Sequence, residues 1–368
     1  MNPRGLDFYR RLTTGMLERG IEPIATLYHW DLPQRLEDAG GWASRDTAHR
    51  FAEYAAVVAE ALGDQVSQWI TQNEPWCSAL LGYQVGRKAP GRQDWAAGLA
   101  ASHHLVLSHG LAMPAIRAAV PGASVGIALN LLPASPETTS EADVAAAVRQ
   151  DGYLNRWFLD PVLRGAYPED MVELYERTVG PFDVVQVGDL AAISAPMDFL
   201  GVNYYNPVVV RASDADPVLG LEHVAPTGWT TAMGWAVDAD GLRSVLTRLR
   251  TEYDVPPVYI TENGAAFDDV VEGGVVDDAE RAAYLEQHVD AVRRAVAEGA
   301  DVRRYCVWSF LDNFEWEDGY AKRFGIVHVD YATQQRTVKR SGLWYRDLIA
   351  RSRNGDGRNE WPASASQA

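Results

Sequence analysis

Short apolar runs alternate along the chain with longer stretches in which apolar residues recur at helical spacing. A short apolar run bounded by turn residues is typical of a buried strand, and the 3.6-residue spacing is typical of a helix that covers it. The alternation therefore predicts repeated βα units, in which parallel strands form one sheet and helices pack outside it. The pattern alone indicates an α/β fold.

Each predicted strand is followed by predicted helical sequence. The strands cover residues 21–27, 66–70, 125–130, 199–203, 258–261 and 304–310. The helices cover residues 3–19, 46–62, 95–119, 241–253, 278–298 and 341–350, with a broken helical region over 141–178. No linker or internal repeat interrupts the series. We therefore expect one catalytic domain over 1–351 and a disordered polar tail over 352–368.

Composition narrows the possible partners. The 368 residues, 47% of them hydrophobic, are sufficient for one large core. A formal net charge of −17 would be repelled by phosphate backbones and anionic lipid, so we expect neither nucleic acid nor a membrane as partner. The alternative meaning of this charge is solubility alone. No apolar stretch reaches the ~18 residues that span a bilayer, and the N-terminal residues lack a signal-peptide pattern.

Residues that could bind a metal or a cofactor give weak signals. Cys77 and Cys306 have no Cys-x-x-Cys spacing, so we expect both to pack as small apolar side chains. His103, His104 and His109 share one helical stretch without the i,i+4 spacing of a zinc pair, which predicts structural roles. No phosphate-binding loop or dinucleotide fingerprint occurs. We therefore expect no cofactor and no metal.

Two glutamates follow apolar predicted strands. Glu74 comes after Asn73 in the sequence, and Glu262 comes after Thr261. Because the carboxyl ends of parallel strands meet at one face, we expect the two carboxyl groups to face each other. Hydrolysis of a glycosidic bond needs one carboxyl group to protonate the leaving oxygen and a second at the anomeric carbon, and a separation of about 5–5.5 Å gives retention. For either glutamate alone, the alternative is a helix cap or a surface ion pair.

The two carboxyl groups need different ionisation. Glu74 must be protonated when the bond breaks, so we expect the negative charge of Glu262 to raise the pKa of Glu74. Once Glu262 carries the sugar, that charge is gone and Glu74 can act as a base toward water.

Several motifs in order along the chain resemble those of glycoside hydrolase family 1. They are Thr71-Gln72-Asn73-Glu74-Pro75, Ile260-Thr261-Glu262-Asn263-Gly264, Leu27-Tyr28-His29-Trp30-Asp31-Leu32-Pro33, Gly201-Val202-Asn203-Tyr204-Tyr205, Trp308-Ser309-Phe310-Leu311-Asp312-Asn313-Phe314-Glu315-Trp316 and Arg323-Phe324-Gly325. The resemblance extends to about Arg351. It implies a (β/α)8 TIM barrel and a β-glucosidase-like retaining enzyme, with Glu74 as acid/base and Glu262 as nucleophile.

The same resemblance implies a set of sugar-binding residues. Its members are His29, Trp30, Asn73, Asn203, Tyr205, Trp235, Trp308, Glu315, Trp316 and Phe324. Among them, His29 and Asn73 would bind glycone hydroxyls and Tyr205 would orient Glu262, with Asn203 nearby. Trp308 would form a platform under the sugar, Trp316 would donate its indole N–H, and Trp235 would flank the leaving group. Without the motifs, each tryptophan is more readily explained as a core residue.

Glu315 bears on the choice of substrate. The resemblance implies that its carboxylate binds the 4- and 6-hydroxyls, and a carboxylate would repel a 6-phosphate. We therefore expect a small oligosaccharide or an aryl or alkyl β-glycoside with an unphosphorylated glycone, which leaves glucose, galactose and fucose open. The resemblance also favours a cytoplasmic location, and the oligomeric state stays open.

The chain departs from the family pattern at its start. Met1 aligns inside the second helix of the barrel, so we expect the first two βα units to be missing and about six to be present. A Gln and an Arg that line the family's site would be missing with them. A misplaced start and a truncated gene are the two explanations. The alternative function is therefore a truncated, catalytically inactive sugar-binding remnant.

Overall fold

The computed structural model describes residues 2–353 and divides into two compact units. Unit 1 comprises residues 1–130 and 152–201, and unit 2 comprises residues 131–151 and 202–368. Each unit is built from two separate segments of the chain. The division therefore does not follow chain order, and a single catalytic domain over 1–351 stays a prediction.

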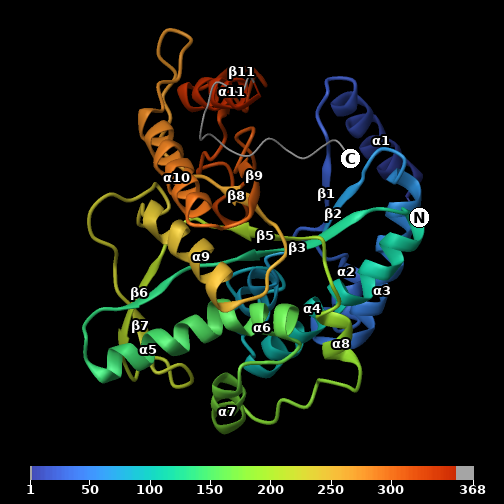
Figure 1. Cartoon of the computed structure of the whole chain (residues 1–368), viewed down its shortest axis with the longest axis vertical. Helices are drawn as coiled ribbons and strands as arrows, with labels where there is room; N and C mark the ends of the chain where they lie inside the picture. Colours follow the sequence, from blue (N-terminus) through green and yellow to red (C-terminus); the bar gives the residue numbers. More distant parts are fainter. Residues whose placement is uncertain (1, 354–368) are drawn as a thin grey trace. The chain divides into compact units, whose positions relative to one another are not determined.

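Unit 1 holds the first strands of the predicted βα series (Figure 1). Its elements are α1 (Pro3–Leu17), β1 (Ile24–Tyr28), α2 (Gln34–Asp38), η1 (Gly41–Ala43), α3 (Arg45–Leu62), β2 (Gln68–Asn73), the π-helix η2 (Cys77–Gln84), α4 (Trp95–Ala119), β3 (Ser124–Asn130), the π-helix η3 (Gly152–Arg156), α6 (Trp157–Arg164), α7 (Glu169–Thr178), α8 (Asp189–Ile193) and the first part of β5 (Phe199–Asn203). The strand order is β1-β2-β3-β5, and β1, β2 and β3 pair in parallel.

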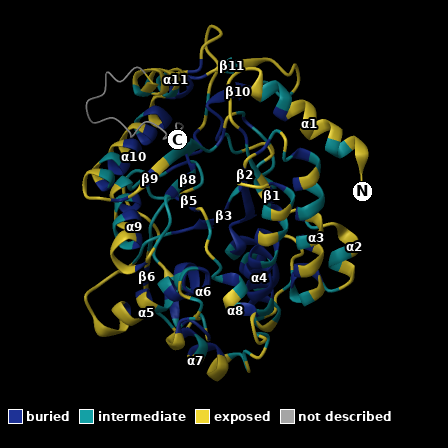
Figure 2. Cartoon of the chain, turned by 45° about the vertical axis from the view of Figure 1, so that its right-hand side comes forward, coloured by how far each residue is buried: buried dark blue, intermediate teal, exposed yellow. Residues whose placement is uncertain are grey.

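The core of unit 1 lies between its sheet and the paired helices α3 and α4. Helix α4 begins at a capped end, where the Asp94 side chain accepts a hydrogen bond from Ala97 N at 3.2 Å. Its sequence is apolar almost all round, and Figure 2 shows its middle part buried, whereas α1 is exposed along much of its length. Trp42, Trp69 and Trp157 are fully buried in this unit.

Unit 2 holds the last strands of the series and two small sheets. Its elements are β4 (Ala134–Pro136), α5 (Glu141–Asp151), the end of β5, β6 (Val208–Ala212), β7 (Leu221–His223), α9 (Ala239–Glu252), β8 (Val258–Asn263), α10 (Ala279–Ala297), β9 (Val302–Val307), η4 (Trp316–Asp318), β10 (Val327–Val329), β11 (Arg336–Val338) and α11 (Arg340–Arg353). The strand order is β5-β8-β9, with β8 and β9 parallel, and α9 packs beside α10 (Figure 1). The small sheets are β4-β6-β7 and β10-β11.

All the predicted strands are present, which confirms the α/β class. One predicted boundary is wrong, because β9 ends at Val307 and not at Phe310. At Ser309 the backbone N–H turns to Phe324 O at 3.3 Å, so the chain leaves β8 and enters a loop. Of the predicted tail, Ser352 and Arg353 belong to α11, and the remainder lies outside the described residues. A loss of two βα units is not shown by these elements.

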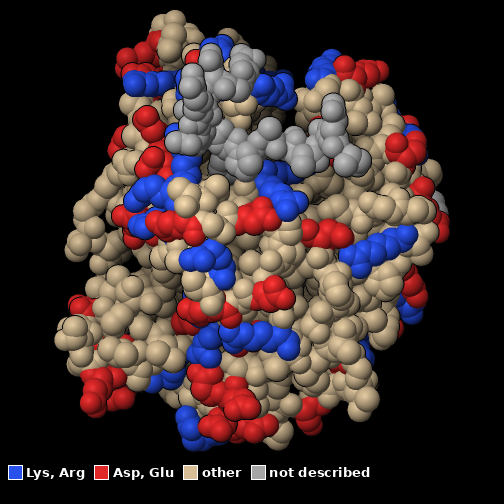
Figure 3. Space-filling model, viewed as in Figure 1, with Lys and Arg blue, Asp and Glu red and all other residues tan. Residues whose placement is uncertain are grey.

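In the part of the chain that the structure describes, no helix combines the length and the apolar character needed to cross a bilayer. The charged side chains show no single basic patch on the face drawn in Figure 3, where Lys and Arg are interspersed with Asp and Glu.

Candidate active site

Glu74 stands at the end of β2, a strand whose residues are all buried. Its backbone turns sharply there, with a φ of 46°, a left-handed value that is uncommon for a residue with a side chain. Two backbone hydrogen bonds of 2.9 Å hold the turn, from Glu74 N to Ala128 O and from Cys77 N to Glu74 O. The strain is thus supported by the neighbouring strand and by the first turn of η2.

The side chain of Glu74 contacts the same turn. The Cys77 thiol donates a hydrogen bond to Glu74 Oε2 at 3.1 Å, and the two residues are 6% and 5% exposed. The expectation for Cys77 was therefore incomplete, because the residue is buried as predicted but its thiol also makes a polar contact. A thiol is a weak donor, and here it meets a carboxyl group that we expect to do chemistry.

His29, Trp30 and Asn73 form a second group in unit 1, at the ends of β1 and β2. His29 Nε2 and Asn73 Nδ2 are 3.2 Å apart, and Trp30 Nε1 donates to Asn73 O at 3.1 Å. Burial, and then the positive charge of Lys88, lower the pKa of His29 to about 4. The ring is therefore neutral at neutral pH, a form that can both donate to and accept from a hydroxyl group. Lys88 Nζ lies 4.3 Å from the centre of the Trp30 ring.

Glu262 stands at the end of β8 in unit 2, where it is 8% exposed. Its Oε2 accepts a hydrogen bond of 2.6 Å from the Tyr205 hydroxyl, and its backbone carbonyl accepts one of 3.0 Å from Tyr204 N. A short hydrogen bond to a carboxylate fixes the side-chain rotamer and stabilises the ionised form. Both are requirements for a carboxylate that attacks carbon.

Asn203 lies beside Glu262 through the paired ends of β5 and β8. Thr261 Oγ1 donates to Asn203 Oδ1 at 2.5 Å, and Asn203 is fully buried. Asn263, the next residue after Glu262, donates to Tyr204 O at 2.7 Å. The amides therefore hold the two strand ends together on either side of Glu262.

Three aromatic residues of the candidate set form one cluster in unit 2. The ring centres are 5.4 Å apart for Tyr205 and Trp235, 6.2 Å for Tyr205 and Phe324, and 6.1 Å for Trp235 and Phe324. The cluster flanks the residue that bonds to Glu262, so Trp235 and Phe324 belong to the surroundings of that carboxyl group.

The loop after β9 carries Trp308, Glu315 and Trp316. Its tip is a tight turn, in which Glu315 N donates to Gly319 O at 2.7 Å and Trp316 has a φ of 43°. At its start, the Trp308 carbonyl lies against Gly264, where a Cβ atom would come within 1.8 Å of the Trp308 oxygen. The glycine that follows Glu262 and Asn263 is therefore needed for the close approach of this loop.

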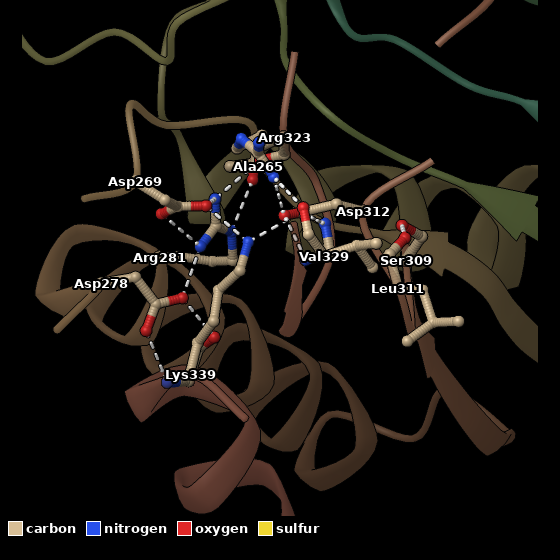
Figure 4. Close-up of polar contacts among 12 residues, drawn as sticks. Ala265, Asp269, Asp278, Arg281, Ser309, Leu311, Asp312, Arg323, Val329 and Lys339 are labelled. Atoms are coloured by element: carbon tan, nitrogen blue, oxygen red, sulfur yellow. Dashed lines mark hydrogen bonds and ion pairs between the residues drawn. The ribbon is translucent and has the colours of Figure 1, made fainter. Parts of the chain in front are cut away.

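A buried cluster of charges includes Asp312 and Arg323 of the same loop (Figure 4). It pairs three cations with three carboxylates, namely Arg281, Arg323, Lys339, Asp269, Asp278 and Asp312. All of these side chains are at most 1% exposed except Arg323, which is 22% exposed. Removing one partner from such a buried group costs about 3–5 kcal/mol, because an uncompensated charge remains.

The structure thus assembles the predicted residues in two sets. Unit 1 brings together His29, Trp30, Asn73 and Glu74, and unit 2 brings together Asn203, Tyr205, Trp235, Glu262 and Phe324, with Trp308, Glu315 and Trp316 on one loop. The polar contact of Cys77, the position of Lys88 and the charge cluster were not predicted from the sequence. Only Cys77 carried a usable signal, because it follows Glu74 by three residues and so shares its turn.

The histidines of α4 contact the core, as predicted. His103 bonds to Asp189 at 2.9 Å, His104 to Trp42 O at 2.9 Å and His109 to Thr71 Oγ1 at 2.7 Å. Within residues 2–353, no three His, Cys, Asp or Glu side chains are grouped so that they could hold a metal ion.

The chain is similar to known β-glucosidases over nearly all of its length. It is 45% identical over 355 residues to a beta-glucosidase of Agrobacterium sp., covering 95% of this chain and 76% of that protein. It is 48% identical over 363 residues to thermostable beta-glucosidase B of Thermobispora bispora, covering 97% of this chain and 74% of that protein. A crystal structure of the GH1 beta-glucosidase from Exiguobacterium antarcticum matches with a TM-score of 0.94 at 43% identity, covering 96% of this chain and 80% of that one.

The family model described as Glycosyl hydrolase family 1 matches residues 1–354. The match contains both glutamates and every other candidate residue described above. This chain belongs to glycosyl hydrolase family 1.

Proposed function

We propose that this protein is a retaining β-glycosidase of the β-glucosidase type, which removes terminal non-reducing, unphosphorylated β-D-glycosyl residues. Membership of glycosyl hydrolase family 1 supports the reaction class, and the relatives named beta-glucosidase support the substrate class. The observation in the structure that carries the proposal is the 2.6 Å hydrogen bond from the Tyr205 hydroxyl to Glu262 Oε2. It gives a buried carboxylate at a strand end a fixed orientation, which an attacking group needs.

In the first step, Glu262 attacks the anomeric carbon while Glu74 gives its proton to the glycosidic oxygen. The bond between the anomeric carbon and that oxygen breaks, the alcohol leaves, and the sugar becomes an ester of Glu262. Tyr205 keeps the attacking oxygen in place, and the buried position of Glu262 limits competition from water.

In the second step, Glu74 takes a proton from a water molecule, whose oxygen attacks the anomeric carbon. The ester bond to Glu262 breaks, and the carboxylate leaves. Two inversions give a product with the β configuration of the substrate. The cycle leaves Glu74 protonated and Glu262 ionised, ready for the next substrate.

The remaining candidate residues would hold the sugar. We assign the 2-hydroxyl to Asn73, neighbouring hydroxyls to His29, and the 4- and 6-hydroxyls to Glu315. The neutral ring of His29 and the fixed amide of Asn73 support this assignment, because both can exchange hydrogen bonds with hydroxyl groups. Trp308 and Trp316 would contact the sugar ring, Trp235 and Phe324 the leaving-group side, and Trp30 and Asn203 would support these contacts.

Hydrolysis of 4-nitrophenyl β-D-glucoside tests the proposal. We expect the Glu262→Ala variant to lose at least about 10⁴-fold in kcat, and sodium azide to restore turnover by entering the space of the missing carboxylate. A single displacement by azide inverts the anomeric centre, so the product should be the α-glucosyl azide. The Glu74→Ala variant should instead give the β-glucosyl azide, since azide then attacks the ester of Glu262 from the other face.

The stereochemistry of the two azides distinguishes the two roles. An α product from Glu74→Ala, or a β product from Glu262→Ala, would reverse the assignment. A sugar-binding remnant predicts a third result, in which glucose raises the melting temperature but the wild-type chain releases no nitrophenol. The cytoplasmic location and the absence of nucleic-acid and membrane partners stay predictions.

A further inference from the structure

Asp312 is the point at which the buried charge cluster reaches the loop that carries Glu315 and Trp316. Four donors converge on its carboxylate (Figure 4). Lys339 Nζ and Gly325 N donate to Oδ1 at 2.8 and 3.0 Å, and Arg323 and Val329 N donate to Oδ2 at 2.6 and 3.3 Å. Asp312 stands at one end of the loop and Arg323 and Gly325 at the other, so a single carboxylate joins both ends.

The approach of the two loop ends is close enough to exclude a side chain. A Cβ atom on Gly325 would come within 2.1 Å of Asp312 N and 2.4 Å of Leu311 C. Between these ends the tip is held by its own backbone, with Glu315 N bonded to Gly319 O at 2.7 Å. The loop is therefore a tight turn at Glu315–Gly319 whose two ends meet at Asp312 and Gly325, which we call its base. A displacement of the base should also displace the turn.

Arg281 of α10 connects this base to the segment that follows Glu262. It donates to Ala265 O at 2.9 Å and to Arg323 O at 2.7 Å, and both carboxylate oxygens of Asp269 accept from it at 3.0 Å. Ala265 lies three residues beyond Glu262. The Arg281 guanidinium thus bonds to two backbone segments. One follows the candidate nucleophile, and the other ends the loop that carries Glu315.

The cluster needs ionised groups at its centre. Each oxygen of Asp312 accepts two hydrogen bonds, whereas an asparagine would place an NH₂ group against two of the same donors. Lys339 precedes α11 and is fully buried, and it also pairs with Asp269. Burial and then the charge of Arg281 lower the pKa of Lys339, while Asp269 and Asp312 act in the opposite direction. Three cations against three carboxylates leave the buried group neutral.

We propose that this cluster determines specificity for the glycone, with Asp312 as a positioning residue that sets where Glu315 meets the 4- and 6-hydroxyls of the sugar. The inference rests on the proposed function, because that function supplies the contact between Glu315 and the sugar. Asp312 and Lys339 do not contact the sugar themselves and act through the position of Glu315. Loosening the base of the loop should displace the Glu315 carboxylate and leave Glu262, which Tyr205 holds separately, in its orientation.

Two substrates that differ at one hydroxyl group test the inference. They are 4-nitrophenyl β-D-glucoside and its 6-deoxy analogue, and the quantity of interest is the ratio of their kcat/KM values. Asp312→Asn and Lys339→Met should each lower this ratio by about fivefold or more, mainly through KM for the glucoside. Hydrolysis of the 6-deoxy substrate should change much less. A purely structural role would lower both rates together and keep the ratio.

Asp189 supplies a matched control in unit 1. Its side chain is 4% exposed, and it pairs with Arg45 and His103, so Asp189→Asn also disrupts a buried ion pair. That variant should lose stability but keep the ratio of the two kcat/KM values. Glu315→Ala serves as the positive control, because it removes the sugar contact itself.

The outcomes separate the inference from the function on which it rests. If the wild-type chain hydrolyses neither substrate, or Glu315→Ala keeps the ratio, the proposed function or the role of Glu315 is wrong. If Glu315→Ala abolishes the preference while Asp312→Asn and Lys339→Met retain it, the inference is overturned. Should those two variants fail to fold, Arg323→Met decides. Arg323 is partly exposed and bonds directly to Asp312, and an unchanged ratio in this variant also overturns the inference.

Discussion

The short turn around Glu74 controls both the backbone and the side chain of that residue. The left-handed φ of 46° points the carboxyl group away from the direction it would take in a continued strand. Cys77, one helical turn further on, then bonds to the carboxyl oxygen at 3.1 Å. The orientation of the candidate acid/base thus depends on a residue that we predicted only as a small apolar side chain.

We expect Cys77→Val to reduce hydrolysis selectively for substrates with poor leaving groups. Valine fills the buried site with a somewhat larger apolar side chain and removes the donor to Glu74. Protonation of the leaving oxygen matters most when that oxygen is basic. The value of kcat/KM should fall about fivefold for an alkyl glucoside, the equivalent of one hydrogen bond, and less than about twofold for 2,4-dinitrophenyl β-D-glucoside.

Cys77→Ser is the matched control, because a hydroxyl group can donate to the same oxygen. It should keep the leaving-group dependence of the wild-type protein. Equal losses for both substrates in Cys77→Val would contradict the positioning role of Cys77 and point to general disruption of the turn.

At the scale of single elements, tight backbone contacts between the ends of neighbouring strands position the candidate site residues. The segment after β8 and the loop after β9 meet where Gly264 faces the Trp308 carbonyl. This contact fixes the start of the loop that carries the candidate sugar-binding residues. It lies two residues beyond Glu262, so packing and chemistry share one short stretch of sequence.

Gly264→Ala should therefore be destabilising. The added Cβ would stand 1.8 Å from the Trp308 oxygen, so one of the two backbones must move. We expect a loss of about 1–3 kcal/mol in the free energy of unfolding, measured by urea denaturation, with a blue or red shift in tryptophan fluorescence if Trp308 moves. Gly15→Ala in α1 is the control, because only the end of Arg19 lies within 4 Å of its added Cβ. There alanine should be neutral or stabilising. An equal effect at both positions would argue against the close approach.

The strands and long helices could be predicted because their patterns repeat over many residues. Helix α4 was predicted at Trp95–Ala119, with both its ends correct, despite Pro114 within it. The strands β4 and β7 could not be predicted, since three residues are too few to show an alternation of apolar and polar positions. The π-helix η2 was missed as well, because its sequence is apolar on every side and has no distinct face.

The candidate site was predictable where polar residues follow apolar strands. Glu74 and Glu262 meet that condition, and the family motifs added the residues around them. The charge cluster could not be predicted, because its members come from three distant segments whose spacing carries no signal. Asp312 appeared only as part of a motif, and nothing in the sequence indicated that Lys339 would be buried against it.

At the scale of the whole molecule, buried histidines link folding to pH. His104 and His109 lie in unit 1 and His288 in unit 2, each at most 5% exposed. Burial lowers the pKa to about 4 for His104, about 3 for His109 and about 4 for His288. The unfolded chain, with histidine pKa values near the ordinary ~6.5, therefore binds more protons than the folded one between about pH 6.5 and 4.

Stability should accordingly fall as the pH is lowered from 7 to 5. Each of the three histidines stays neutral in the folded state while it gains a proton in the unfolded state, which costs about 1–2 kcal/mol over this range. The free energy of unfolding, measured by urea titration at both pH values, should show the loss. His109→Gln should remove one share of the dependence. A free energy of unfolding that is constant from pH 7 to 5 would mean that these rings are protonated in the folded protein or that its interior admits water.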